Sequence, residues 1–293
     1  MNNALGFVEG RGFAGVIKAT DQMPKTSDVE YFQYVNISGS FNTIIYQGEV
    51  GAVRAAVETA AQFVNEVGVL HTTNIIPRPN EKIYDFITNN KELSIPSDEY
   101  GLALGMVETK GFAPMIEAAD AGIKSAKVIL ANWLTVGGGY TTVFFRGDVA
   151  AVTAAVEAAE TSAAKLGDII CRHIIPSPHA FTNMVLPIGK PANIKPENIK
   201  EIKEKHRTEA IGVFETQGFT QLVEGIDAGV KAATVINTGW YKVGSAMVST
   251  IFRGDVAAVK TAVSAAKFAA EKLGKVLSSY VIPRPHSAVE KII

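Results

Sequence analysis

The side chains that could carry out chemistry are few, and they do not form a recognisable catalytic set. Of the five histidines, His173 and His179 are separated by a Pro-x-Pro segment, and the others lie at positions that do not match one another. Because a metal site needs several ligands at defined spacing, we expect none. The single cysteine, Cys171, has no cysteine partner for a disulfide or a cluster. No Ser/His/Asp set or pair of carboxylates recurs along the chain, so we predict neither enzymatic activity nor a cofactor.

Three glycine-containing segments are the strongest candidates for a binding site. They lie at 36–41, 135–140 and 242–247. Phosphate-binding loops of the G-x-G-x-x-G or Gly-Lys-Ser/Thr type join a strand to a helix, whereas these segments join two apolar strands. One such loop needs only a tight turn with positive φ. Three loops at the same place indicate that several backbones approach a shared point too closely for side chains.

The loops recur because the chain is an internal repeat. A shift of 99 residues places 5–79 on 104–178, and a further shift of 107 places that segment on 211–285, without a gap inside any copy. Such a period is typical of tandem structural units. The predicted divisions are unit 1 (1–80), a linker (81–102), unit 2 (103–179), a linker (180–209) and unit 3 (210–293).

Each unit carries the same order of predicted elements. An apolar strand, a Gly-Phe turn and a helix come first, then two strands around the glycine loop, then an alanine-rich helix and a strand that ends at Pro-x-Pro. This βαββαβ order, the split βαβ arrangement, predicts an α+β, ferredoxin-like fold. Pro24 should end or kink the first helix just before Lys25.

Charged residues also recur at fixed places in the units. Acidic residues at the start of each second helix predict N-caps, which is why we interpret the Arg-Gly-Asp tripeptides there as caps and not as adhesion signals. A glutamate at the end of each first strand is most simply explained as a residue that makes a structural hydrogen bond. The Asp and Lys four residues apart on each first helix could form only a surface ion pair or take part in an interaction, and the sequence leaves both open. In unit order these residues are Glu49, Asp148 and Asp255; Glu9, Glu108 and Glu215; and Asp21–Lys25, Asp120–Lys124 and Asp227–Lys231.

The composition excludes several classes of partner. The formal net charge of −1 provides no basic field for nucleic acid or an anionic membrane. No apolar stretch approaches the roughly 18 residues of a transmembrane helix, and the chain shows no signal-peptide pattern. One cysteine fits a reducing compartment, so we expect a cytoplasmic protein. Units of this size bury little surface alone and gain from association.

The combined motifs resemble the shell-protein domain of bacterial microcompartments. Unit 3 matches as closely as unit 2, and unit 1 is the most divergent, with Gln47-Gly-Glu-Val where the others have Arg-Gly-Asp-Val. The resemblance covers all three units and neither linker. In unit 2 the motifs are Leu104-Gly-Met-Val-Glu-Thr-Lys-Gly-Phe112, Ala118-Ala-Asp-Ala-Gly-Ile-Lys-Ser-Ala126, Val136-Gly-Gly-Gly, Phe145-Arg-Gly-Asp-Val149 and Ile174-Ile-Pro-Ser-Pro-His179.

The resemblance implies a structural role. In that family six domains close into a hexagonal disc around a central pore, and discs tile into the shell of a protein organelle in the cytoplasm. A chain of three such domains is then expected to form a pseudohexamer as a homodimer, since two times three units fill six places. The implied partners are a second copy, other microcompartment shell proteins and small polar or weakly anionic metabolites that cross the pore.

The resemblance also assigns residues to these roles. The lysine that often begins the family's loop is matched only by Lys242, and Ser177 stands where units 1 and 3 have an arginine. The implied pore lining is Ser38, Gly39, Ser40, Gly137, Gly138, Gly139, Gly244, Ser245 and Ala246; the pore mouth is Asn36, Thr135 and Lys242; and the inter-tile edge is Lys25, Lys124, Lys231, Arg78 and Arg284.

A second hypothesis is a ligand-binding regulator, because βαββαβ domains also form small nucleotide-sensing oligomers. The glycine loops would then hold a phosphate. Two of the three loops lack a lysine, which disfavours this alternative. Hexagonal plates in electron microscopy of the purified protein would separate the two hypotheses.

Overall fold

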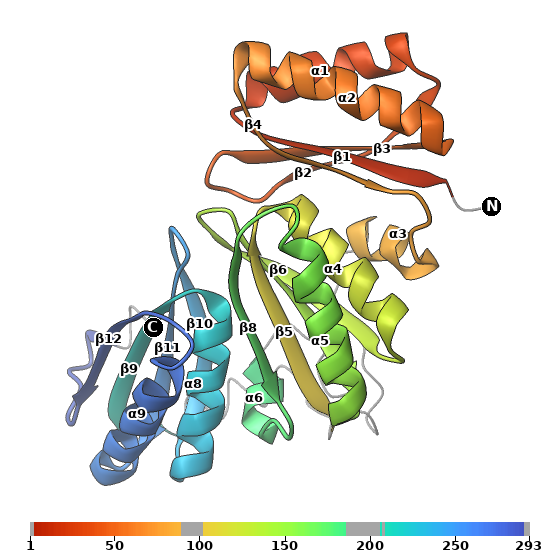
Figure 1. Ribbon diagram of the computed structural model, residues 1–293. Coiled ribbons are helices and arrows are strands. Elements are labelled where there is room, and N and C mark those ends of the chain that lie inside the picture. The colour runs from red at the N-terminus through yellow and green to blue at the C-terminus, as the bar shows by residue number, and fades with distance from the viewer. Residues whose placement is uncertain (1–2, 89–101, 186–205, 207–208, 290–293) are drawn as a thin grey trace.

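The fold consists of three similar α+β units along the chain. The computed structural model describes residues 3–88, 102–185, 206 and 209–289. In this part of the chain three four-stranded antiparallel sheets each carry two helices on one face (Figure 1). The strand orders β2-β3-β1-β4, β6-β7-β5-β8 and β10-β11-β9-β12 are equivalent. The predicted fold of three tandem βαββαβ units is therefore confirmed.

Each unit begins with its central strand, which pairs antiparallel with two neighbours. Unit 1 comprises β1 (Ala4–Arg11), α1 (Phe13–Thr26), β2 (Val29–Asn36), β3 (Phe41–Gly48), α2 (Val50–Val67) and β4 (Val69–Ile76). Unit 2 comprises β5 (Ala103–Lys110), α4 (Phe112–Ser125), β6 (Ile129–Gly137), β7 (Tyr140–Gly147), α5 (Val149–Ala163) and β8 (Ile169–Ile175). Unit 3 comprises β9 (Ala210–Gln217), α8 (Phe219–Ala232), β10 (Ile236–Gly244), β11 (Met247–Gly254), α9 (Val256–Ala270) and β12 (Val276–Ile282).

Small residues allow the second helix of each unit to lie close against its sheet. A Cβ atom at Gly105, in the central strand of unit 2, would lie 2.6 Å from Cγ1 of Val152 on α5. Gly6 and Gly212 occupy the same place in units 1 and 3, with the same kind of contact. The buried side of α5 consists largely of alanine and valine, so helix and sheet pack at the high density of a protein interior.

The predicted N-caps of the second helices are confirmed. The side chain of Glu49 accepts a hydrogen bond from the amide of Gly51 at 2.7 Å, and Asp148 accepts one from Ala151 at 2.8 Å. Asp255 caps α9 in the same way, through the amides of Ala257 and Ala258. The Arg-Gly-Asp segments therefore start helices, and Arg146 is buried where it donates to the carbonyl of Leu102.

The prediction that Pro24 could end the first helix just before Lys25 is wrong. Helix α1 continues to Thr26 and has the same length, 14 residues, as α4 and α8. Pro24 has no amide hydrogen to donate to the carbonyl of Thr20. The hydroxyl of Tyr46 donates to that carbonyl instead, at 2.8 Å, so the helix continues without leaving this acceptor unpaired.

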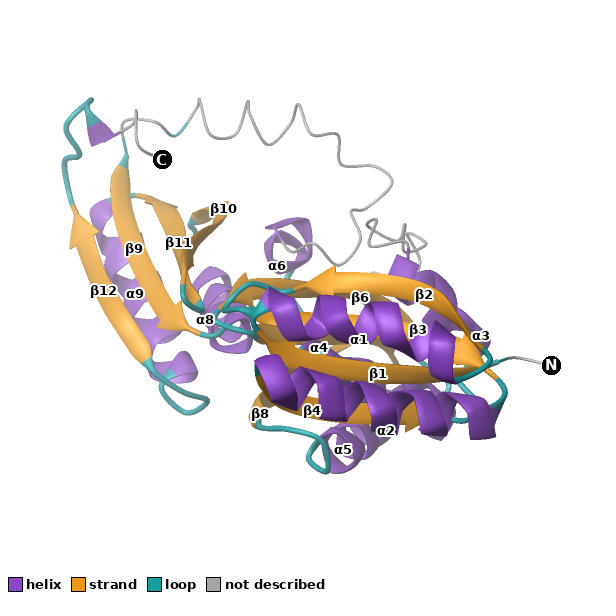
Figure 2. Cartoon of the chain, turned by 90° about the horizontal axis from the view of Figure 1, so that it is seen from above, coloured by secondary structure: helices purple, strands orange, loops and turns teal. Residues whose placement is uncertain are grey.

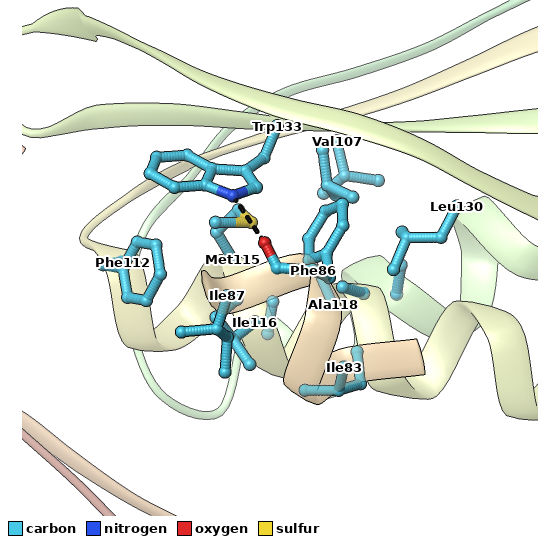
Figure 3. Packing of buried hydrophobic residues seen from close by; sticks show 14 of the residues in the cluster. Ile83, Phe86, Ile87, Val107, Phe112, Met115, Ile116, Ala118, Leu130 and Trp133 are labelled. Carbon is cyan, nitrogen blue, oxygen red and sulfur yellow. Dashed lines mark hydrogen bonds between the residues drawn. The ribbon is translucent and has the colours of Figure 1, made fainter. Parts of the chain in front are cut away.

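The two predicted linkers each begin with a short helix. Helix α3 (Glu81–Thr88) buries Ile83, Phe86 and Ile87 against unit 2, and the indole Nε1 of Trp133 donates to the carbonyl of Phe86 at 3.0 Å (Figure 3). Helix α6 (Ala180–Val185) contacts α8 and β10. Most of the remaining linker residues lie outside the described part of the chain.

Consecutive units pack by one repeated arrangement. The first helix of each later unit lies on the sheet of the unit before it: α4 contacts β1 and β4, and α8 contacts β5 and β8 (Figures 1 and 2). Leu5 and Phe7 of β1 therefore belong to the core of unit 2, and Leu104 and Met106 of β5 belong to the core of unit 3. We call the contact between units 1 and 2 the first interface and that between units 2 and 3 the second interface.

Candidate functional site

The three glycine loops lie against one another in chain order, near a common point (Figure 1). A Cβ atom at Gly39 would lie 2.8 Å from the carbonyl carbon of Gly138 and from the nitrogen of Gly139. A Cβ atom at Gly138 would in turn lie 3.3 Å from the carbonyl carbon of Ser245. Contacts below 3.0 Å are sterically forbidden, so glycine at position 39 is required by the approach of the neighbouring backbone. The loop of unit 2 lies between the other two.

The loops share an uncommon backbone conformation. Each has three consecutive residues at positive φ: from 62° to 96° over Gly137–Gly139, from 63° to 68° over Ser38–Ser40 and from 52° to 115° over Gly244–Ala246. Three of the nine residues are serine and one is alanine, for which this region costs energy. Such strain is maintained where the surrounding structure fixes the backbone. The last residue of each loop provides part of that support, because its carbonyl accepts a hydrogen bond from Gly12, Gly111 or Gly218.

Hydrogen bonds also cross between the loops of different units at their outer ends. The hydroxyl of Thr135 donates to the carbonyl of Ile37 at 2.9 Å, and Nζ of Lys242 donates to the carbonyl of Thr135 at 3.1 Å. Asn36 bonds within its own unit, to Asn42. The loops that hold the residues assigned to the pore mouth and the pore lining therefore contact one another from unit to unit along the chain.

A glutamate from each earlier unit crosses the interface to the next unit. Glu9 accepts a hydrogen bond from the amide of Phe112 at 2.6 Å, and Glu108 accepts one from the amide of Phe219 at 2.8 Å. Each glutamate also accepts a longer bond from the following amide. These amides begin α4 and α8, whose own N-cap positions are glycines without side-chain bonds. The buried carboxylates therefore cap the positive helix ends of the next unit.

The recurrence of these glutamates suggested a hydrogen-bonding role, but not that the bonds cross between units. A helix whose N-cap position is glycine must obtain an acceptor elsewhere. The Gly-Phe turn at the start of each first helix was therefore the signal in the sequence that could have predicted an external cap.

Burial dominates the electrostatics of these carboxylates. Both Glu9 and Glu108 have no exposed side-chain surface. Desolvation raises the pKa of both above the ordinary value, while the bonds from Thr43 and the helix amides oppose the rise for Glu9, and the helix amides oppose it for Glu108. His71 lies 3.8 Å from Glu9 at the first interface. Burial likewise raises the pKa of the Cys171 thiol to about 12, which makes it a poor nucleophile at neutral pH.

An aromatic pair lies next to each of the helix N-termini that Glu9 and Glu108 cap. The ring of Phe112 lies 5.0 Å from that of Trp133, edge to face, and Phe219 lies 4.9 Å from Trp240 in the same geometry. Both phenylalanines are fully buried. Each interface therefore has a tryptophan next to the capped helix end.

The Asp and Lys pairs on the first helices hold the Pro-x-Pro turn of the preceding unit. Asp120 accepts from the amide of Asn80 at 2.7 Å, and Lys124 donates to the carbonyl of Arg78 at 2.6 Å. At the second interface Asp227 accepts from His179, and Lys231 donates to the carbonyl of Ser177 at 2.7 Å. In the part of the chain that the structure describes, Asp21 and Lys25 pair only with each other and with Gln22, at the exposed surface. Of the readings that the sequence left open, the structure thus supports interaction in units 2 and 3.

The residues assigned to the inter-tile edge lie in two kinds of place. Lys124 and Lys231 bridge units within the chain while their side chains stay 42% and 44% exposed. Arg78 and Arg284 are exposed. Arg78 lines an open groove of about 650 Å³ together with Glu49 and Glu81. The assigned edge side chains therefore remain accessible.

The histidines are distributed among these contacts. His173 bonds to Glu224 at 2.8 Å across the second interface. Nδ1 of His206 lies 2.8 Å from a carboxylate oxygen of Glu209. The described residues contain no group of three or more His, Cys, Asp or Glu that could hold a metal ion. None of the described helices is both long and apolar enough to span a membrane.

The chain belongs to the BMC domain family. The BMC domain matches it three times, at residues 4–79, 103–178 and 210–285. It is 50% identical over 94 residues to the carboxysome shell protein CsoS1C of Hydrogenovibrio crunogenus, covering 32% of this chain and 92% of that protein. It is 51% identical over 87 residues to the bacterial microcompartment shell protein PduA of Salmonella typhimurium, covering 30% of this chain and 93% of that protein.

Longer similarities extend over more than one unit. The carboxysome assembly protein CcmO of a Synechocystis strain is 34% identical over 182 residues, which is 60% of this chain and 61% of that protein. The chain thus spans less than two thirds of the length of this relative. A crystal structure of a microcompartments protein from Desulfitobacterium hafniense is similar with a TM-score of 0.51 and 29% identity, over 65% of this chain and 98% of that one. These relatives do not favour the hypothesis of a ligand-binding regulator.

Proposed function

We propose that the protein is a non-enzymatic structural component of a bacterial microcompartment shell, located in the cytoplasm. The observation that supports this proposal most strongly is that three BMC units pack by one repeated arrangement, with their glycine loops against one another. Repeating one rotation brings equivalent loops around a common axis. Three units then make half of a six-membered ring, and a homodimer completes a pseudohexameric tile.

The axis of this tile is a pore for small polar metabolites. Its lining is the three loops, each present twice, with the narrowest point at Gly39, Gly138 and Ser245. Small side chains and exposed backbone groups provide hydrogen-bonding partners without blocking the opening. Asn36, Thr135 and Lys242 form the mouth, which then carries one positive charge per chain.

Tiling with other shell proteins uses the edge residues. The exposed Arg78 and Arg284 and the partly exposed Lys124 and Lys231 support this assignment. Lys25 completes the set in unit 1. Because unit 2 has Ser177 where the others have arginine, one edge of each half-ring differs from the rest, and sheets of the tile would have a preferred orientation.

Electron microscopy of the purified protein tests the structural role. We expect six-lobed particles with a central opening, and flat hexagonal sheets at high concentration. Irregular particles without a ring would refute the tile. The pore is tested by metabolite flux into shells assembled with the variants Gly138→Leu and Ser245→Leu. The control is Val149→Leu, at the exposed start of α5, beyond the end of β7 that lies away from the glycine loop. Unchanged flux in the loop variants would refute the pore.

A further inference from the structure

The first helix of unit 1 has an uncovered apolar face. The side chains of Phe13 and Ile17 are 57% and 50% exposed. The equivalent residues, at the same places in the repeat, are Phe112 and Ile116 on α4 and Phe219 and Val223 on α8, and all four are fully buried. Large apolar residues side by side on a helix and left uncovered mark an interaction surface.

Within the described residues, no carboxylate accepts a hydrogen bond from the first amides of this helix, as Glu9 and Glu108 do from those of α4 and α8. Asp21 and Lys25, equivalent to the pairs that hold a Pro-x-Pro turn in units 2 and 3, remain exposed and bonded locally. Unit 1 therefore presents the apolar helix face, the helix N-terminus and the Asp–Lys pair that receive the preceding unit at the first and second interfaces.

Unit 3 presents the complementary elements. Glu215 occupies the position of Glu9 and Glu108 and, like Glu9, is oriented by a hydroxyl of the neighbouring strand, here Ser249. Glu215 is only partly buried, whereas Glu9 and Glu108 are completely buried. Tyr280 of β12 is 49% exposed, and Arg284 of the closing Pro-x-Pro turn is exposed as well.

We infer that unit 3 of one copy docks on α1 of a second copy, and that Glu215 caps this helix by accepting hydrogen bonds from the amides of Phe13 and Ala14. The inference rests on the proposed homodimer and identifies its contact. Asp21 and Lys25 receive the turn around Arg284, as their equivalents receive the turns around Arg78 and Ser177. The contact occurs twice in the dimer, so both open ends are closed and no free face remains for a filament.

One pair distinguishes this third interface from the two within the chain. Asn74 bonds to Glu117 at the first interface, and His173 bonds to Glu224 at the second. The equivalent residues are Tyr280 and Lys18. A phenol therefore faces an ammonium group where the internal interfaces have a carboxylate. Lys18 forms an ion pair with Glu66 of its own unit. Its charge is therefore already balanced, and the third interface contains no carboxylate without a partner at this point.

Sedimentation equilibrium of Glu215→Ala tests the cap. Loss of a helix N-cap lowers affinity about tenfold per interface, so the dimer dissociation constant should rise on the order of a hundredfold, since the ring contains two such interfaces. Glu271→Ala, at an exposed carboxylate of the same unit, is the matched control and should leave the constant unchanged. Far-ultraviolet circular dichroism establishes that each variant is folded.

Cross-linking tests the docking independently of any loss of affinity. Two single variants, Lys18→Cys and Tyr280→Cys, are mixed and treated with a short bismaleimide. We expect a covalent species of two chains in the mixture and little in either variant alone. If the wild-type protein is a dimer but Glu215→Ala does not weaken it, the inference is overturned and the proposed dimer remains. The same holds if the mixture of the two cysteine variants gives no cross-linked species of two chains. A wild-type protein that stays monomeric, or that associates only when another shell protein is added, overturns both.

Discussion

The substitution Glu108→Ala should weaken the second interface and leave the first unchanged. Glu108 is completely buried and accepts hydrogen bonds from the amides of Phe219 at 2.8 Å and Thr220 at 3.3 Å. Removing a helix N-cap costs about 0.5–2 kcal/mol, and a buried amide left without an acceptor costs about 1–3 kcal/mol. Both figures describe the loss of the same acceptor, and the second bond is long, so we expect a loss of about 1–3 kcal/mol, confined to unit 3 and its contact with unit 2.

The two tryptophans of the chain make this prediction measurable at each interface separately. Trp240 lies against Phe219 and Trp133 against Phe112, so the variants Trp133→Phe and Trp240→Phe each leave one reporter. Separate reporters are needed because a chain of three units need not unfold in one step. In urea titrations Glu108→Ala should lower the midpoint reported by Trp240 and not the midpoint reported by Trp133. Glu9→Ala should do the reverse, and Glu157→Ala, at an exposed position of α5, should change neither. Equal shifts at both reporters would refute the assignment of one carboxylate to each interface.

Three further predictions follow from the contacts described above. Because burial raises the pKa of Glu108 above 4.5, its contribution to stability should be greatest below that value and should fall as the pH rises through the folded-state pKa; urea titrations of Trp240 from pH 4 to 8 should show this slope, and Glu108→Gln should abolish it. Tyr46→Phe should destabilise unit 1 by about 1–2 kcal/mol, since the carbonyl of Thr20 loses its donor, and Pro24→Ala should restore much of the loss by supplying a helix amide; absence of rescue in the thermal melts of the double variant would contradict this role. Gly39→Val should disturb the packing of the first two loops, because its Cβ would lie 2.8 Å from backbone atoms of unit 2. Gly244→Val is the control: its φ of 115° is more strained for valine than the 63° of Gly39, but a Cβ there has nothing within 4 Å. Equal effects of the two variants on hydrogen exchange of residues 135–140 would show that strain and not crowding is responsible.

Local residue patterns predicted the fold of each unit well. The N-caps at Glu49, Asp148 and Asp255 follow from side chains that act on their own helices, and the period of the repeat fixes the order of strands. Pro24 was misjudged because the residue that compensates for it, Tyr46, lies 22 positions further along the chain and acts through the fold.

The glycine loops and the glutamates show what the repeat could and could not predict. Three glycine loops at equivalent positions predicted convergence, and Gly39 does lie against Gly138. The recipients of the glutamate bonds could not be predicted, because the amides of Phe112 and Phe219 belong to the next unit and their position depends on how the units pack. Helix α3 was likewise assigned to a linker, because its apolar residues become buried only by packing against unit 2, which the local sequence does not reveal.

The native mass of the purified protein is the most direct test of the half-ring. Native mass spectrometry should give a species of two chains, twice the 31.2 kDa of one chain, and class averages of the same sample should show six lobes around an opening. A stable trimer would contradict the account, because nine units cannot occupy six places, and so would an open series of ever larger species.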